Sequence, residues 1–236
     1  MNPAPPGGRR KAAVLFDVDG TLVDSVYFHT VAWWQAFRQA GYDVPMASIH
    51  RSVGMGGDRI LARLLPADRD AGDDSTIMAS HAAVFSTFWP SLEPLDGARE
   101  LLERCHGGGL AVALASSARE RDLEVLRSAI GADSFIDAAT SSADAKESKP
   151  APDILVAALD ALGVRASDAV YVGDAVWDIY AAGKLDIPAI GLTCGGTSAA
   201  ELRDAGAAEI YETPRALLEN LPDSAIGRLA ARVHRS

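Results

Sequence analysis

The sequence has little cysteine, little positive charge and no long hydrophobic run, and each shortage excludes a class of protein. Cys105 and Cys194 are the only cysteines among 236 residues, so neither a disulfide framework nor a cysteine metal site is expected. Lys and Arg number 22 against 32 Asp and Glu, which gives a net charge of −10 and disfavours binding to nucleic-acid phosphates. No apolar run approaches the roughly 18 residues of a membrane span. We therefore expect no nucleic-acid partner and no membrane partner.

The N-terminal segment also lacks the apolar core of a signal peptide. Residues 1–11 read MNPAPPGGRRK, and their Pro and Gly content predicts a flexible tail. Together with the few cysteines, this predicts a cytoplasmic protein. The composition, 48% hydrophobic and 23% charged, is typical of a globular protein with one sizeable core. It does not indicate the oligomeric state.

Short apolar runs alternate with longer amphipathic segments along most of the chain. The runs read as buried strands, because each is too short for a comfortable helix; they cover residues 12–16, 110–115, 169–172 and 188–192. The amphipathic segments predict helices over 97–106, 118–130 and 152–162. Such alternation implies an α/β fold, with a parallel sheet covered by helices on both faces.

The stretch from residue 25 to residue 92 breaks this alternation. Its apolar residues recur at helical spacing and no clear strand is present. We interpret it as a helical domain inserted after the first strand. Residues 1–24 and 93–236 then form the sheet domain, and the two chain crossings between the parts would act as hinges.

Polar side chains stand beside the carboxyl ends of the predicted strands. The residues concerned are Asp17 and Asp19 after the first strand, Ser116 and Ser117 after the second, Lys149 before the third, and Asp174 and Asp178 after it. Ligands of open parallel sheets bind beyond these ends. We therefore expect the acidic groups, a hydroxyl and an ammonium to converge in one crevice.

This set of groups suits phosphoryl transfer. Crowded carboxylates repel one another unless a cation is bound, and Mg²⁺ prefers hard oxygen ligands. Asp17 can attack phosphorus to give an aspartyl-phosphate, while Asp19 can protonate the leaving oxygen and later deprotonate water. Ser116 can hold phosphate oxygens, and Lys149 can neutralise the transferring group and orient Asp17.

The same residues resemble the signature motifs of the haloacid dehalogenase superfamily. The segments DVDGTLVDS, LASSA, SKPAPD and GDAVWD occur in the family's order and cover nearly the whole chain. The resemblance implies a Rossmann-like parallel-sheet core with an inserted helical cap. It also implies a metal site with the Asp17 carboxylate, the Asp19 backbone carbonyl and the Asp174 carboxylate, and with Asp178 acting through water or from behind the ligands. Ala175 departs from the pattern, since many relatives carry Ser there.

Several activities of the superfamily fit this sequence poorly. Dehalogenases look different at the position of Asp19, because a halide needs no proton. Phosphonoacetaldehyde hydrolases need a cap lysine, and residues 25–92 contain none. A magnesium-dependent phosphatase acting on a small phosphorylated metabolite is therefore the first hypothesis. A sugar phosphomutase similar to β-phosphoglucomutase is the alternative, because the run DSVYFHTVAW, with His29, resembles that group.

The choice between phosphatase and phosphomutase rests on the loop at residues 52–58, and only on its resemblance to the loops of known mutases. Mutases of that group resemble one another in carrying an arginine within this loop, whereas here Arg51 and Arg59 stand only at its edges. We expect Met55 and Gly56 to touch the substrate when the cap closes, and Arg51 to bind a second anionic group or to pair with Asp58 or Asp43. His29 has two interpretations, a hinge or proton-relay residue and simple packing near the base of the cap, and we favour the second.

Overall fold

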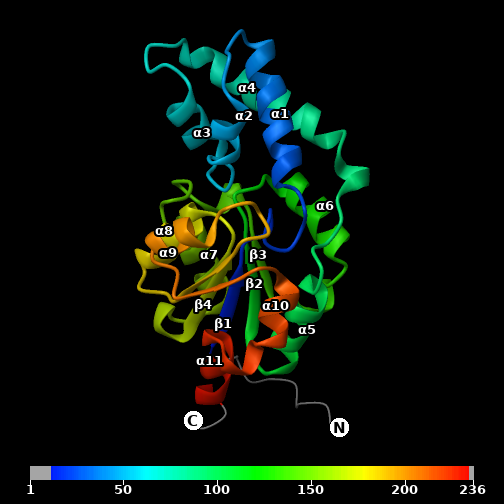
Figure 1. Ribbon diagram of the computed structural model, residues 1–236, viewed down its shortest axis with the longest axis vertical. Coiled ribbons are helices and arrows are strands. Elements are labelled where there is room, and N and C mark those ends of the chain that lie inside the picture. The colour runs from blue at the N-terminus through cyan, green and yellow to red at the C-terminus, as the bar shows by residue number, and fades with distance from the viewer. Residues whose placement is uncertain (1–11, 234–236) are drawn as a thin grey trace.

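The computed structural model of the protein describes residues 12–233 (Figure 1). The predicted N-terminal tail lies outside these residues. Six parallel strands form one sheet in the order β3-β2-β1-β4-β5-β6, with the bounds β1 Ala13–Phe16, β2 Ala111–Ala115, β3 Ala138–Thr140, β4 Ala169–Gly173, β5 Ala189–Leu192 and β6 Glu209–Tyr211. The predicted α/β fold with a parallel sheet is confirmed.

Helices cover both faces of the sheet because both faces are apolar. In β1, Val14 and Phe16 face one hydrophobic cluster, and Ala13 and Leu15 face the other, as the period of two in a strand requires. The first cluster includes residues of α5 (Ala98–Gly107), α6 (Glu120–Ile130), α10 (Pro214–Glu219) and α11 (Ala225–Val233). The second includes residues of α7 (Asp153–Leu162), α8 (Val176–Gly183) and α9 (Ala199–Asp204).

A separate group of helices lies above the carboxyl ends of the strands (Figure 1). It contains α1 (Val26–Gln39), α2 (Met46–His50), α3 (Gly57–Leu64) and α4 (Asp74–Ser86), with short 3-10 turns at Ala71–Asp73 and Trp89–Ser91. These helices bury their own hydrophobic cluster, which includes Trp33, Phe37, Ile49, Leu61 and Ile77. The boundary of a cap domain at residues 25 and 92 stays a prediction.

The four apolar runs and the three amphipathic segments became strands and helices within two residues of their predicted ends. Sequence reasoning missed β3 and β6, which have three residues each. Both are edge strands, and Glu209 to Tyr211 are all partly exposed. Their weak apolar signal therefore follows from half-buried positions.

The strand order creates a crevice between β1 and β4. The chain proceeds from β1 to β2 and β3 on one side, then crosses back to β4 on the other side of β1. Ligands of such sheets bind where the order reverses. Asp17 follows β1 and Asp174 follows β4, so both stand at this point. Among the described helices, none is long and apolar enough to cross a bilayer.

Candidate active site

Asp17 is fixed at the end of β1 by backbone and side-chain contacts. Its amide N–H donates to the carbonyl of Val172 at 2.8 Å, which extends the β1–β4 pairing one residue beyond the strand. The buried ammonium of Lys149 lies 2.6 Å from Asp17 Oδ1. The two residues are 132 positions apart in the sequence, so the fold itself assembles this ion pair.

Asp178 fixes Lys149 from the other side. Its Oδ1 lies 2.8 Å from Lys149 Nζ and accepts a hydrogen bond from the Tyr171 hydroxyl at 2.9 Å. Its Oδ2 accepts from the amide of Ala175 at 3.0 Å, in the first turn of α8. Burial would lower the pKa of Lys149, but the two carboxylates outweigh it and raise the pKa. The ammonium therefore stays charged beside Asp17.

Asp19 is held by residues at the start of the helical group. Ser25 Oγ donates to Asp19 Oδ1 at 2.6 Å, and His29 Nε2 lies 3.1 Å from the same oxygen. Burial would raise the pKa of Asp19, but His29 and Ser25 outweigh it and lower the pKa. His29 also stacks on Phe85 with ring centres 3.8 Å apart. Packing alone is thus an incomplete account of His29, because its ring also contacts a candidate catalytic carboxylate.

Asp174 completes an acidic cluster between the strand ends. Oxygens of Asp17, Asp174 and Asp178 all lie within 4.8 Å of one another. Thr21 Oγ1 donates to Asp174 Oδ1 at 3.0 Å. Burial, followed by the charges of Asp178 and Asp17, raises the pKa of Asp174 well above its usual value.

Repulsion within this cluster indicates a cation site. Burial and the neighbouring Asp178 and Asp19 raise the pKa of Asp17 to about 8, although Lys149 opposes the shift. Lys149 partly neutralises Asp17 and Asp178, with which it forms ion pairs. Among the described residues, it forms no ion pair with Asp174. A bound divalent cation would stabilise the ionised carboxylates, and carboxylate oxygens are the ligands that Mg²⁺ prefers. The residues present therefore fit such an ion.

Two glycines leave space for the carboxylate of Asp174. A Cβ atom placed on Gly195 would lie 1.7 Å from Asp174 Oδ2, and one on Gly20 would lie 2.5 Å from it. Gly20 also has a φ of +77°, which a side chain would strain. The backbone at Gly20 and at Gly195 thus lies so close to the Asp174 carboxylate that a residue with a Cβ atom would collide with it.

The serines after β2 take two different positions. Ser116 is buried, and its Oγ accepts from the amide of Ala118 at 3.0 Å. Ser117 lines the cavity above the strand ends and donates to the carbonyl of Gly54 at 3.3 Å. The local turn that Ser116 forms therefore directs Ser117 toward the loop that joins α2 and α3.

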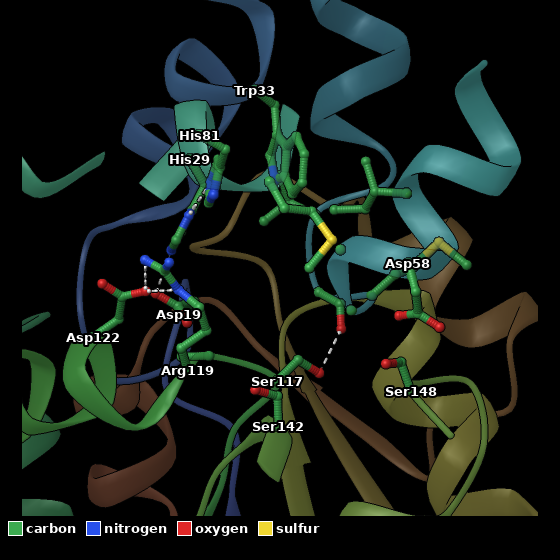
Figure 2. A pocket seen from close by; sticks show the side chains of 18 of the residues that line it. Asp19, His29, Trp33, Asp58, His81, Ser117, Arg119, Asp122, Ser142 and Ser148 are labelled. Carbon is green, nitrogen blue, oxygen red and sulfur yellow. Dashed lines mark hydrogen bonds and ion pairs between the residues drawn. The ribbon is translucent and has the colours of Figure 1, made fainter. Parts of the chain in front are cut away.

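A cavity of about 170 Å³ lies between the helical group and the sheet domain. Figure 2 shows its lining, with His29, Trp33 and His81 above and Ser117, Arg119 and Ser142 below. Asp17, Asp19, Met55 and Gly56 also line it, so the loop at residues 52–58 and the two candidate catalytic carboxylates share one cavity. A Cβ on Gly56 would lie 2.1 Å from Ser148 Oγ, which shows how closely this loop approaches the sheet domain.

Arg51 does not line this cavity, and neither do Ser116, Lys149, Asp174 and Asp178. Arg51 follows α2, and its Nε lies 3.8 Å from Glu201 Oε1, in a second hollow formed with the residues after β4 and β5. Its carbonyl accepts from Trp177 Nε1 at 3.1 Å. One of the two predicted alternatives for Arg51, an ion pair with Asp58 or Asp43, is wrong, because those acids pair with Arg59 and Arg38.

The cavity lining also contains polar residues that were not predicted from the sequence, among them Arg119, Asp122 and His81. Arg119 donates from Nε and Nη2 to Asp122 Oδ2 at 3.0 and 2.8 Å. His81 Nε2 lies 3.2 Å from His29 Nδ1, and burial lowers the pKa of His81 well below its usual value. Arg119 and Asp122 follow Ser116 within six residues, so the helix after β2 held a signal that could have been read.

Comparison with known proteins shows to which family the chain belongs. The model of the haloacid dehalogenase-like hydrolases matches residues 11–186. The chain belongs to the haloacid dehalogenase-like hydrolase family. The acidic cluster, the buried Lys149 and the two serines after β2 are therefore the candidate active site of a hydrolase of this family.

Individual relatives and one solved structure agree with the assignment. The chain is 32% identical to the chloroplastic protein SUPPRESSOR OF QUENCHING 1 of Arabidopsis thaliana over 85% of its own length, but spans only 19% of that relative. It is 31% identical to a phosphoglycolate phosphatase of Vibrio parahaemolyticus, covering 77% of this chain and 83% of the relative. The crystal structure of a hydrolase from Pseudomonas syringae matches with a TM-score of 0.87 and 31% identity, over 91% of this chain and 100% of that one.

Proposed function

We propose that this hydrolase is a magnesium-dependent phosphatase that removes phosphate from a small metabolite through an aspartyl-phosphate on Asp17. The observation that carries the proposal is the ion pair between Asp17 and the buried Lys149. Asp17 lines the cavity together with Asp19. Membership of the family and the similarity to phosphoglycolate phosphatases support a phosphoric monoester hydrolase.

In the first half of the reaction, a carboxylate oxygen of Asp17 attacks phosphorus. The bond between phosphorus and the ester oxygen breaks, and the leaving oxygen takes its electron pair. Asp19 donates a proton to that oxygen, and the approach of a phosphate dianion favours the protonated form of Asp19 beforehand. Lys149 stabilises the charge on the transferring group while its contact with Asp178 keeps it in place.

In the second half, water attacks the phosphorus of the aspartyl-phosphate. Asp19 now accepts the proton from that water, and the bond between Asp17 and phosphorus breaks to release inorganic phosphate. His29 Nε2, 3.1 Å from Asp19 Oδ1, can hold or return a proton at that oxygen. The enzyme is then ready for another ester.

The acidic cluster supplies the ligands for the magnesium ion. Asp17 and Asp174 would hold it with their carboxylates and Asp19 with its backbone carbonyl. Asp178 supports the site from behind, because Lys149, Tyr171 and the amide of Ala175 already bond to its oxygens. When bound, the ion neutralises the negative charge of the phosphoryl group.

A sugar phosphomutase is the second candidate. His29 stands in the segment that resembles the mutase group, and it contacts Asp19, whose proton a mutase must give to and take from sugar hydroxyls. Against this, Arg51 pairs with Glu201 and no arginine stands within the loop at residues 52–58. Conversion of a sugar monophosphate into its isomer without release of phosphate would favour the mutase.

Release of inorganic phosphate from a panel of phosphorylated metabolites tests the proposal. With Mg²⁺ the wild-type protein should release phosphate, and a chelator should stop the release. Asp17→Asn should lower kcat by at least about 1000-fold, because an amide is a poor nucleophile. Asp24→Asn is the matched control, since Asp24 is an exposed acid of the same loop, and should retain activity.

Each outcome separates the mechanism from its alternatives. Folded Asp17→Asn protein that still turns over would contradict the covalent mechanism. A wild-type protein that binds Mg²⁺ but releases phosphate from none of the metabolites would contradict the phosphatase assignment altogether.

A further inference from the structure

Exposed apolar side chains gather around the second hollow, between the helical group and the sheet domain. Tyr27, Met46 and Tyr180 are 60%, 42% and 44% exposed, and all three line this hollow of about 730 Å³. Small-molecule sites in proteins are concave, mostly apolar and roughly 300–1000 Å³ in volume. Exposed apolar side chains that converge on such a hollow mark a binding surface, whereas isolated ones need no explanation.

The loop at residues 52–58 separates this hollow from the cavity above Asp17 and Asp19. Among the described residues, only Val53 lines both. A Cβ atom on Gly54 would lie 2.8 Å from Ala175 Cβ, so the loop packs directly against the start of α8. Figure 1 shows α2 and α3 above α8 and α9. An occupant of the hollow would therefore contact the helical group and the sheet domain without entering the catalytic cavity.

The hollow also presents two arginines whose charge is incompletely paired. Arg63 lies over the Trp177 ring, 5.0 Å from its centre, and forms an ion pair with none of the described carboxylates. Arg51 Nε is 3.8 Å from Glu201 Oε1, which is beyond hydrogen-bond distance. Both partners of that pair are exposed, so it contributes little. A ligand can therefore bind either guanidinium without breaking a strong contact.

A second arginine over a tryptophan shows what Arg63 lacks. Arg38 lies 6.0 Å from the centre of the Trp34 ring, and its Nη1 donates to Asp43 Oδ1 at 3.0 Å. Arg63 has the same kind of aromatic contact, but no such carboxylate partner among the described residues. The planar guanidinium suits a carboxylate or another oxyanion, to which it can donate two parallel hydrogen bonds. An anionic ligand would supply the missing partner.

The remaining charges of the hollow also favour an anion. Glu201 faces Arg51 and Asp174 is only 4% exposed, so neither offers a free carboxylate to a cationic ligand. A cation would instead meet Arg51 and Arg63. A flat aromatic ring suits the rest of the hollow, because it can stack on the tyrosines and lie against a guanidinium plane.

We propose that this hollow binds a planar aromatic molecule that carries a carboxylate or a similar oxyanion. The ring packs against Tyr27, Met46 and Tyr180, and the oxyanion binds the guanidinium of Arg63, with Arg51 adding favourable charge. Charge-assisted hydrogen bonds should favour the anion over its neutral amide by about 10- to 100-fold. The site is independent of the phosphatase proposal, because none of these groups takes part in that reaction.

Titration calorimetry with naphthalene-2-carboxylate and naphthalene-2-sulfonate tests the site. Naphthalene-2-carboxamide is the neutral probe, and 2-naphthylmethylamine is the cationic probe. Decahydronaphthalene-2-carboxylate keeps the charge but has no aromatic ring. All titrations contain a chelator, so that no probe binds through a metal ion beside Asp174.

Arg63→Gln and Trp177→Leu alter the proposed site. Arg38→Gln is the matched control, because it removes an arginine that lies over a tryptophan outside the hollow. Arg119→Gln removes a cation from the cavity above Asp17 and Asp19, and so reports whether a probe binds there instead. Thermal melting shows whether each variant is folded. Arg63 is exposed, so Arg63→Gln decides the outcome if Trp177→Leu fails to fold.

Both anions should bind the wild type at least about 10-fold more tightly than the amide or the amine, and more tightly than the saturated carboxylate binds. Arg63→Gln should weaken their binding by at least about 10-fold and Trp177→Leu by at least about 3-fold, whereas Arg38→Gln and Arg119→Gln should bind them like the wild type.

Several results would overturn the proposal. They are the absence of saturable binding of either anion at millimolar concentration, equal affinity for the amide or for the saturated carboxylate, and unchanged affinity in folded Arg63→Gln protein. A loss of affinity in Arg119→Gln alone would place the probe in the cavity above Asp17 and Asp19, and would overturn the assignment to the second hollow.

Discussion

Substitution of Gly195 by alanine should weaken magnesium binding without unfolding the protein. A Cβ on Gly195 would lie 1.7 Å from Asp174 Oδ2, whereas real Cβ atoms essentially never approach another atom to less than 3.0 Å. The carboxylate must therefore move by more than an ångström. Gly195 does not have a positive φ, so the backbone itself tolerates alanine.

Magnesium tolerates such a displacement poorly, because it requires near-ideal ligand distances of about 2.0–2.1 Å. Disturbing even the partners behind a metal ligand costs about 10- to 100-fold in affinity, and we expect at least that loss in Gly195→Ala. Isothermal titration calorimetry with Mg²⁺ measures the effect, and circular dichroism confirms the fold.

Gly183→Ala provides the matched control. Gly183 ends α8, and apart from its chain neighbours and the backbone of its own helix no described atom lies within 4 Å of the position of its Cβ. This variant should bind Mg²⁺ like the wild type. Equal affinity in folded Gly195→Ala protein would refute the assignment of Asp174 as a ligand.

Two further predictions concern the buried charges. Lys149→Met should destabilise the protein by about 3–5 kcal/mol in urea unfolding, because it leaves Asp17 and Asp178 buried without their counter-charge; the exposed Lys184→Met is the control, and equal losses in both would contradict the reasoning. The second concerns pH. The pKa of Asp17 is raised to about 8 and that of Asp174 well above its usual value, whereas both ionise near 4 in the unfolded chain. In chelator, the stability that these groups contribute should therefore fall as pH rises from about 4 to about 8, since the unfolded state loses its protons first. The rise in Tm on adding Mg²⁺ should grow over the same range, and a constant rise would count against a cation bound by these carboxylates.

The candidate catalytic centre could be predicted from the sequence because its residues follow strands. Asp17 and Ser116 stand directly after apolar runs, and Asp174 follows the next such run with only Gly173 between them. Parallel strands bring their carboxyl ends to one edge, so residue order alone predicts their convergence. The structure places them there, with Lys149 between Asp17 and Asp178.

The cap side of the cavity was much less predictable. Arg51 and Met55 are only four residues apart, yet Met55 lines the cavity and Arg51 turns toward Glu201. That difference depends on how α2 ends and on the packing of the helical group against the sheet domain, which local sequence does not encode. His81 likewise acquires its significance only through contact with His29, 52 residues away.

The Arg119 and Asp122 pair is intermediate between these cases. Its spacing of three residues at the start of a helix is visible in the sequence and has an ordinary structural explanation, since such pairs are common on helix surfaces. What distinguishes it is the burial of Asp122 and the unpartnered Oδ1. Both properties arise from tertiary packing.

Detection of a phosphoryl group on Asp17 tests the central claim most directly. Wild-type protein is mixed with Mg²⁺ and an excess of a hydrolysed ester, quenched in acid within milliseconds, and digested for mass spectrometry. We expect the mass of one phosphoryl group on the peptide that contains Asp17, and its disappearance in Asp17→Asn. A wild-type enzyme that turns over while this peptide stays unmodified at every quench time, or that carries the phosphoryl group on another residue, would contradict it.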